Sequence, residues 1–326
     1  MERNVCLDIA KAICIVLVVI GHYFPADAPM WYVNFRFLIY TFHMPLFLFA
    51  SGYIYQSFKK EESYMSFVMK KMRRLMVPYL ATSVVIITIK LFTQSNLYVE
   101  HAVTWFSYVR MFYMPEAGYF LWFVWSLFSM FLIAPLLKTK AVRLSAFFIA
   151  LLIHYLPFDQ MNVFALSETK RMFMWFMLGV FCCDLRIQEK IDVLKRKKYF
   201  LYLVIVVAFG FLATYDMREY ASCLSWLGIA LVMVAASLLE KLPKRNGLMG
   251  ALLTLSTSSY IIYLFHTTFE GFAKSIVNKL SDGEVLSQME FFFSAIIVIS
   301  CGVLFPILLH KFVLVRNSCL KFLFGL

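Results

Sequence analysis

The first residues that could do chemistry lie in one apolar stretch near the start of the sequence. It reads LDIAKAICIVLVVIGHY and contains Asp8, Lys11 and His22. Lys11 and His22 are separated by close to three helical turns, so they share one helix face about 16 Å apart along the axis. Asp8 and Lys11 are spaced i, i+3 and can form an ion pair. An imidazole exchanges protons near neutral pH, which is the chemistry of general acid–base catalysis.

A second interpretation of these residues is structural. In it, Asp8 and Lys11 form a buried ion pair, and His22 is hydrogen-bonded at the outer interface of a membrane. A charged residue within a membrane span is costly and is a functional candidate by default. Residue types alone do not decide between the two interpretations.

Two further histidines lie in apolar stretches. FRFLIYTFHMPLFLFASGY carries Arg36 and His43 on one helix face, and SSYIIYLFHTTF carries His266. Pro45 frees a backbone carbonyl in the preceding turn, which a ligand or a side chain can then approach. His43 could therefore serve chemistry or satisfy the broken backbone. All three imidazoles are expected at similar depth in the outer half of the membrane, which a shared polar pocket explains better than independent placement.

A basic cluster occurs in KKEESYMSFVMKKMRRLMVPY, and its members are Lys70, Lys71, Arg73 and Arg74. Such a cluster can anchor a protein to anionic lipid, and the sequence alone favours that interpretation. It can also clamp the phosphates of a cytosolic ligand. In GYFLWFVWSLF, Trp122 and Trp125 are either ordinary interface aromatics or the apolar wall of a substrate site.

The elements that must position these residues are membrane-spanning helices. Of the 326 residues, 62% are apolar and 15% are charged, against roughly 25% charged in soluble domains. This composition excludes disorder and an ordinary water-soluble enzyme. A span needs about 20 mostly apolar residues. Ten such runs occur, at about 5–24, 34–57, 75–93, 118–137, 141–157, 171–186, 199–215, 220–239, 248–269 and 290–314.

The predicted fold class is therefore all-α, a polytopic transmembrane bundle that forms a single domain over residues 1–326. Basic residues set its orientation, because cytoplasmic loops carry an excess of Lys and Arg. With the N-terminus inside, 22 of the 31 Lys and Arg residues fall in inner segments and 6 in outer segments. Both termini are thus predicted to be cytoplasmic. The net charge of +12 reports these loops rather than nucleic-acid binding, and no zinc-binding or phosphate-loop motif is present.

Four motifs resemble those of the acyltransferase-3 superfamily of integral membrane O-acyltransferases, in particular its fucose 4-O-acetylase-like branch. They are LDIAKAICIVLVVIGH, FHMPLFLFASGY, KKMRRLMVPY and YFLWFVWSLF, with SSYIIYLFH in support. The resemblance covers nearly the whole chain. In that family a basic residue and a histidine are separated by ten residues, matching Lys11 and His22 here. An Arg-x-x-Arg pair matches Lys71 and Arg74, where Lys keeps the charge but loses the bidentate fork.

The resemblance implies transfer of an acetyl group from cytosolic acetyl-CoA to a hydroxyl of an extracytoplasmic or lipid-linked sugar or glycan. The protein would be a multi-pass protein of a bacterial inner membrane and would use no metal. Expected catalytic residues are His22 as general base, His43 as an orienting or oxyanion group, and Lys11 positioned by Asp8. Expected acetyl-CoA contacts are Lys70, Lys71, Arg73, Arg74 and Arg36; expected acceptor contacts are Trp122, Trp125 and His266.

Alternatives remain at this point. An acyl-histidine relay could replace direct transfer, and the donor could be succinyl-CoA. A glycan or metabolite transporter would also need charges within the membrane, but it would not consume acetyl-CoA. A sensor or structural membrane protein is a third class, and the three outer-half histidines count against it. Lys90 lies within a predicted span and has no assigned role.

Overall fold

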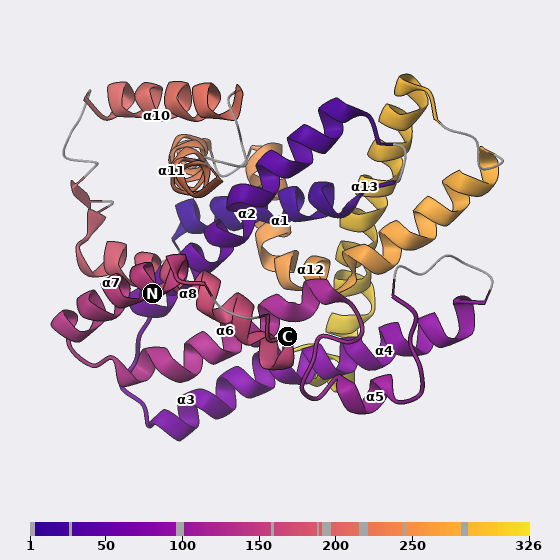
Figure 1. Cartoon of the computed structure of the whole chain (residues 1–326), viewed down its shortest axis with the longest axis horizontal. Coiled ribbons are helices and arrows are strands. Elements are labelled where there is room, and N and C mark those ends of the chain that lie inside the picture. Colours follow the sequence, from indigo (N-terminus) through magenta and orange to yellow (C-terminus); the bar gives the residue numbers. More distant parts are fainter. Residues whose placement is uncertain are drawn as a thin grey trace. The chain divides into compact units, whose positions relative to one another are not determined.

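A computed structural model describes residues 4–25, 28–95, 101–157, 160–187, 189–190, 197–214, 221–243, 246–281 and 286–326. Across these residues the regular elements are all helices, so the all-α prediction is confirmed (Figure 1). Some residues behind the predicted topology lie outside the described residues: Arg3, Lys195, Arg196, Arg218, Lys244, Arg245 and the junction at residues 216–220.

A helix occupies each of the ten predicted spans in the described part of the chain. These helices are α1 (Val5–His22), α2 (Met30–Ser57), α4 (Val77–Thr93), α6 (Trp122–Ile133), α7 (Lys140–Tyr155), α8 (Leu166–Asp184), α10 (Lys197–Thr214), α11 (Ala221–Leu239), α12 (Gly247–Leu280) and α13 (Gln288–Phe312). Shorter elements are α3 (Tyr64–Lys71), the π-helix η1 (Met72–Met76), α5 (Ser107–Arg110), α14 (Ser318–Leu323) and four 3₁₀ turns, η2 (Tyr119–Leu121), η3 (Ala134–Leu136), η4 (Val163–Ala165) and η5 (Leu314–Arg316).

Seven helical stretches of the described chain are long and apolar enough to cross a membrane. They are Val5–His22, Met30–Ser57, Tyr64–Thr93, Tyr119–Leu136, Ala221–Leu239, Gly247–Leu280 and Gln288–Arg316. The helices α7, α8 and α10 are not among them, and α7 has only 16 residues. The protein is thus a polytopic membrane protein, and the count of ten spans and the cytoplasmic termini stay predictions.

Helix ends differ from the predicted spans where polar residues interrupt an apolar run. The ninth span was expected to end at 269, but α12 continues to Leu280 through Glu270 and Lys274. The third was expected to begin at 75, but α3, η1 and α4 follow one another without a break from Tyr64. A helix satisfies its own backbone hydrogen bonds, so it can continue past the apolar residues that mark it in the sequence.

The contacts within the chain divide it into two compact units. Unit 1 comprises Met1–Ala50 and Leu185–Leu308, and unit 2 comprises Ser51–Asp184 and Leu309–Leu326. In unit 1, α1 packs against both α11 and α12, and α11 packs against α10. Ile9, Ala10, Ala12 and Cys14 of α1 are fully buried. The helix that carries the first candidate residues is therefore enclosed on several sides.

Unit 2 is built around contacts of α8 with α6 and α7. A buried ion pair joins two of these helices: Arg143 Nε lies 2.6 Å from Asp184 Oδ2, and Arg143 Nη2 lies 3.0 Å from Asp184 Oδ1. Gln56 Nε2 donates to Asp184 Oδ1 at 2.7 Å. Arg143 also donates to the Lys138 carbonyl at 2.9 Å. This network ties α7, α8 and the end of α2 together.

Removal of one member of this network is expected to destabilise unit 2. Arg143→Met leaves the Asp184 carboxylate buried without its cation, a change that costs about 3 to 5 kcal/mol. Unfolding of the detergent-solubilised protein by denaturant measures the loss. Lys140→Met removes an exposed cation of the same helix and serves as the control. Adding Asp184→Leu to Arg143→Met should recover much of the loss, and equal stability of Arg143→Met and wild type would contradict the prediction.

Candidate active site: the histidine cluster of unit 1

Unit 1 brings together the three histidines predicted to share a pocket. The His22 ring of α1 lies edge-on to the His266 ring of α12, with 4.7 Å between their centroids. Tyr40 of α2 continues the cluster, at 6.1 Å from His22 and 4.8 Å from His43. We call His22, Tyr40, His43 and His266 the histidine cluster. Their assembly from three helices makes chance placement of the imidazoles a poor explanation.

Each imidazole of the histidine cluster is held by a hydrogen bond to its own helix. The ring atom Nδ1 faces a backbone carbonyl one turn earlier, and because a carbonyl can only accept, Nδ1 carries the proton of the neutral ring. The distances are 2.9 Å from His22 to Val18, 2.9 Å from His43 to Ile39 and 2.8 Å from His266 to Tyr263. Nε2 of each neutral ring therefore holds the lone pair and is the basic atom.

Burial separates the three histidines. His43 is 2% exposed and His266 is fully buried, whereas His22 is only partly buried. A general base must approach the proton that it removes. His22 is thus the histidine of the cluster that is best placed to meet a substrate.

Pro45 bears on the structural interpretation of His43. The proline lacks an N–H, so the Thr41 carbonyl one turn earlier loses its helical donor. The hydroxyl of Ser225 on α11 donates to that carbonyl. His43 instead donates to Ile39, so it is not needed to satisfy the broken backbone. The interpretation that gave His43 this task is therefore wrong, because Ser225 performs it.

Arg36 sits beside the histidine cluster. Its Nε donates to the Gly21 carbonyl at 2.6 Å, and its guanidinium lies 4.3 Å from the centre of the Phe24 ring and 4.4 Å from that of Tyr40. Gly21 allows the Tyr40 ring to lie against α1, because a Cβ at residue 21 would lie 2.8 Å from Cε2 of that ring. Sequence reasoning missed Tyr40 and Gly21. The available signals were the i, i+4 spacing of Arg36 and Tyr40 and the position of Gly21 directly before His22.

Asp8 and Lys11 form the ion pair expected from their spacing. Lys11 Nζ lies 2.8 Å from Asp8 Oδ1, which also accepts from the Ser256 hydroxyl at 2.9 Å. Asp8 is 8% exposed, and the Lys11 side chain retains 25% of its exposure. A buried carboxylate with two partners fixes the position of the lysine in the N-terminal half of α1.

Unit 2 carries the basic cluster, and its members differ in surroundings. Lys71 turns toward aromatic rings, with Nζ 3.9 Å from the centre of Phe131. Lys70 pairs with Glu62, and the hydrogen bond from this lysine lowers the pKa of the Glu62 carboxyl. The Arg73 guanidinium lies 4.8 Å from the centre of the Phe322 ring of α14. Arg74 is exposed.

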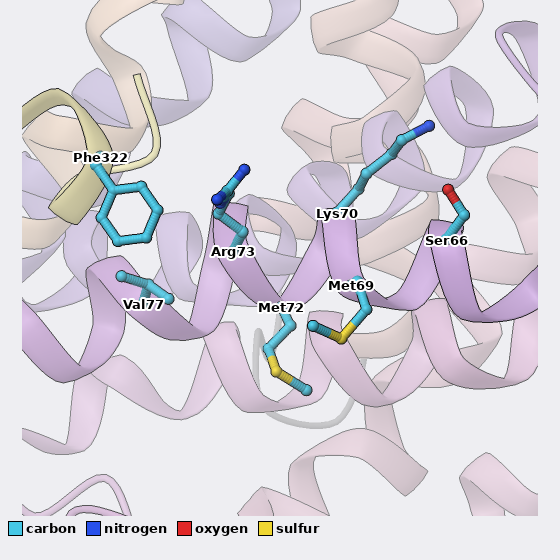
Figure 2. Close-up of a pocket in the computed structure, with 7 residues that line it drawn as sticks. All are labelled: Ser66, Met69, Lys70, Met72, Arg73, Val77 and Phe322. Atoms are coloured by element: carbon cyan, nitrogen blue, oxygen red, sulfur yellow. The ribbon is translucent and has the colours of Figure 1, made fainter.

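A cavity of about 510 Å³ opens beside the basic cluster (Figure 2). Figure 2 shows Lys70 and Arg73 projecting from the same side of the helix, with Phe322 approaching from α14. The lining of this cavity is mostly apolar and includes an aromatic ring and two basic residues, of which Lys70 is paired with Glu62. Its lining consists of Ser66, Met69, Lys70, Met72, Arg73, Val77 and Phe322.

The two candidate tryptophans are buried within unit 2, so they are not interface aromatics. Trp122 is 8% exposed and Trp125 is 9% exposed. Trp125 packs between Tyr79 and Phe164, at 5.6 and 5.1 Å between ring centroids. Its Nε1 is buried and lies within hydrogen-bonding range of the Tyr79 side chain. A bound molecule would compete with Tyr79 for this donor.

Lys90 lies in the last turn of α4, where its Nζ is 3.5 Å from the His101 carbonyl. A cation at this position is favoured by the partial negative charge of the helix C-terminus. Among the described residues, no group of three or more His, Cys, Asp or Glu side chains is arranged to hold a metal.

The fold and the cluster define a polytopic membrane protein with basic imidazole nitrogens held inside a helical unit. Residues 4–310 match a family described as acyltransferase domain, the acyltransferase-3 family. The chain belongs to this family. Membership in the fucose 4-O-acetylase-like branch stays a prediction.

One curated protein is similar over part of the chain. Nodulation protein NolL of Mesorhizobium japonicum is 30% identical over 147 residues, which cover 42% of this chain and 37% of that protein. The match thus spans well under half of the length of that relative. No solved structure matches the chain.

The bond from Ser225 to the Thr41 carbonyl makes a prediction about stability. Ser225→Ala should lower the free energy of unfolding by about 1 to 2 kcal/mol, because it leaves a buried carbonyl without a donor. Pro45→Ala restores an N–H that can bond Thr41, so the Ser225→Ala loss should vanish in that background. Denaturant unfolding of the four proteins measures the coupling, and purely additive effects would contradict this account of Pro45.

Proposed function

We propose that this protein is an acyltransferase, and specifically an O-acetyltransferase of a bacterial inner membrane. It would move an acetyl group from cytosolic acetyl-CoA to a hydroxyl of an extracytoplasmic or lipid-linked sugar or glycan. The observation that carries the proposal is the geometry of the histidine cluster, in which the accessible His22 presents a basic Nε2. The family supplies the reaction class, acyl transfer. The acetyl donor and the sugar acceptor are our inference.

In this mechanism His22 acts as general base. Its Nε2 removes the proton of the acceptor hydroxyl while the hydroxyl oxygen attacks the thioester carbonyl. A C–O bond forms, the C–S bond breaks, and the thiolate of CoA leaves. The imidazolium of His22 then returns the proton to the thiolate, so the products are the acetyl ester and free CoA. Nδ1 keeps its proton throughout, because it stays bonded to Val18.

The neighbours of His22 receive supporting roles. His43 orients the acceptor hydroxyl by accepting a hydrogen bond at Nε2, because the one N–H of its neutral ring is committed to the Ile39 carbonyl. Arg36 donates a hydrogen bond to the carbonyl of Gly21, the residue directly before His22. This position supports the assignment of Arg36 to the acyl end of the donor. Lys11, fixed by Asp8, lines the inner part of the path along α1. His266 supports the His22 ring from its edge.

Unit 2 is assigned to binding of the donor and the acceptor. The cavity beside the basic cluster offers Arg73 and Lys70 to the phosphates of CoA and the Phe322 face to its adenine. Lys71 and Arg74 add positive charge on the same segment. The buried Nε1 of Trp125 is a donor that a sugar oxygen could accept from, with Trp122 as an apolar wall.

Removal of the base tests the reaction. His22→Ala should fold and enter the membrane but lose acetyl transfer by about 100-fold or more, the size of a general-base contribution. The assay combines radiolabelled acetyl-CoA with membranes of a deletion strain, whose glycans supply the acceptor. Mass spectrometry of the glycans should show one added acetyl group. His101→Ala, a loop histidine outside the cluster, is the matched control.

The same assay separates the competing functions. A transporter would consume no labelled acetyl-CoA, with or without His22. An acyl-histidine relay would leave label on the wild-type protein after a rapid quench in the absence of acceptor, and none on His22→Ala. Transfer by His22→Ala at the wild-type rate would contradict the general-base role.

Binding of a CoA fragment tests the cavity of unit 2 without any acceptor. The probe is 3′-phosphoadenosine 5′-phosphate, which carries the adenine and phosphates but no thioester. It should raise the thermal midpoint of the purified protein by mass action. Arg73→Ala should weaken its apparent Kd by about tenfold or more, since a charge-assisted hydrogen bond is worth about 1.5 to 3 kcal/mol.

Two comparisons sharpen the fragment experiment. Lys140→Ala removes an exposed cation elsewhere in unit 2 and should leave binding unchanged. Nanodiscs with and without anionic lipid show whether lipid headgroups compete for the cluster. Equal fragment affinity in Arg73→Ala and wild type would contradict CoA binding by the basic cluster. Anchoring to anionic lipid would then be the better account of these residues.

A further inference from the structure

Acyl transfer places negative charge on the carbonyl oxygen of the thioester, and donors aimed at such an oxygen are usually the largest single contribution to catalysis. The three imidazoles cannot supply a donor while they are neutral. A neutral ring has one N–H, and in His22, His43 and His266 this N–H is bonded to a backbone carbonyl of the same helix. The donor must therefore come from another side chain at the histidine cluster.

Tyr40 of α2 is the member of the histidine cluster that carries a hydroxyl. Its ring centroid lies 6.1 Å from that of His22 and 4.8 Å from that of His43. In the proposed mechanism these two histidines are the base and the residue that orients the acceptor. Tyr40 is 38% exposed and His22 is partly buried, so both can be reached from outside the cluster. A substrate that meets the base thus also meets Tyr40.

Arg36 prepares this hydroxyl to act as a donor. Arg36 Nη2 donates to the Tyr40 hydroxyl oxygen at 3.3 Å, and the guanidinium lies 4.4 Å from the centre of the Tyr40 ring. A guanidinium cannot accept a hydrogen bond, so the phenolic proton is directed to another acceptor. Hydrogen bonds in a chain polarise one another, which makes the hydroxyl a stronger donor.

The positive charge of Arg36 is also suited to an oxygen that becomes negative. Among the described residues, no carboxylate forms an ion pair with Arg36. A charged side chain within a membrane span is costly and is a functional candidate by default. Its charge is thus available to an anion that forms during the reaction.

Gly21 places both Tyr40 and Arg36 before any substrate binds. A Cβ at residue 21 would lie 2.8 Å from Cε2 of Tyr40, so the absence of a side chain lets the ring lie against α1. The Gly21 carbonyl accepts from Arg36 Nε at 2.6 Å. Phe24 holds the guanidinium as well, with 4.3 Å to its ring centre. A donor that is already held in place needs no reorganisation at the moment of reaction.

We propose that Tyr40 is a catalytic residue whose hydroxyl donates to the carbonyl oxygen of the acetyl thioester, and that Arg36 is a positioning residue that holds and polarises this hydroxyl. The charge forms on the oxygen when the acceptor oxygen bonds to the carbonyl carbon, and it disappears when the C–S bond breaks. Tyr40 keeps its proton throughout, so the balance of the transfer is unchanged. This inference rests on the proposed function and deepens it. Neither the family match nor the motifs assign a role to Tyr40.

Tyr40→Phe removes the hydroxyl and keeps the ring with its contacts. With radiolabelled acetyl-CoA and membranes of the deletion strain, kcat should fall about 100- to 1000-fold, the usual cost of removing one such donor. The KM for acetyl-CoA should stay unchanged, because the bond strengthens only in the transition state. Equal kcat in Tyr40→Phe and wild type would overturn the proposal.

Tyr32→Phe is the matched control for a structural role. The Tyr32 hydroxyl also joins α2 to α1, by donating to the Ile20 carbonyl at 2.7 Å. Its loss should lower the thermal midpoint of the purified protein and leave kcat unchanged. If Tyr32→Phe lowers kcat as strongly as Tyr40→Phe, any hydroxyl that joins these helices has the same effect and the proposal fails.

Replacement of the carbonyl oxygen separates a donor from a residue that only supports the fold. The probe is the dithioester analogue of acetyl-CoA, in which sulfur takes the place of that oxygen. Sulfur is a weak hydrogen-bond acceptor, so wild type should react more slowly with this analogue than with acetyl-CoA. In Tyr40→Phe the ratio of the two rates should be about tenfold smaller, the value of one hydrogen bond to a charged group. The same ratio in both proteins would contradict a contact between Tyr40 and the carbonyl oxygen.

A double-variant experiment tests the role of Arg36. Arg36→Met should lower kcat about tenfold or more, since a charge-assisted hydrogen bond to the hydroxyl is lost. In the Tyr40→Phe background the same change should cost little, because the hydroxyl through which Arg36 acts is already absent. Equal losses in the two backgrounds would refute the positioning role.

Wild type and His22→Ala in the same assay separate the two levels of inference. Absence of transfer by wild type would refute the proposed function and the role of Tyr40 with it. Transfer by wild type and not by His22→Ala supports the function. The Tyr40 and Arg36 variants then decide on the oxyanion donor alone.

Discussion

The hydrogen bond from each imidazole Nδ1 to a carbonyl of its own helix is the constraint on which the candidate site depends. It fixes the ring orientation and the tautomer at once, and it leaves Nε2 as the basic atom at three places. Because the donor and the acceptor lie on the same helix, the tautomer does not depend on how the helices pack. Packing then decides which of the three rings a substrate can reach, and burial leaves His22 the most accessible.

Two buried charged groups of the described residues are held by protein partners. Asp8 has Lys11 and Ser256, and Arg143 has Asp184 and two carbonyls. Such pairs add little net stability compared with apolar side chains of the same size, but each is costly to break. They therefore act mainly to fix which faces of the helices meet. Glu270 departs from this pattern, because its Oε1 is buried without such a partner in the described chain.

Much of the fold could be predicted from the sequence, because apolar runs mark helices in a membrane and the structure places a helix at all ten of them. The spacing of Asp8 and Lys11 likewise predicted their ion pair, since it depends on one helix only. The close approaches could not be predicted. Whether Tyr40 reaches Gly21, or Glu270 reaches Gly302, depends on how separate helices pack against each other. The length of α12 was missed because a span counted by apolar residues ends at the first acid, while the hydrogen bonds of the helix continue.

The π-helix η1 has a consequence for how the basic cluster is presented. A single π turn holds one residue more than the α-helical turn it replaces, so it rotates the preceding segment by about 100° relative to the following helix. The segment can thus place the Lys71 side chain against Phe131 while Arg73 meets Phe322 of α14. A regular helix would give this sequence a different division of its cations between interior and surface. The inserted residue therefore sets the rotation of the segment about the helix axis. This rotation decides which cations point toward a bound ligand and which point toward the rest of the protein.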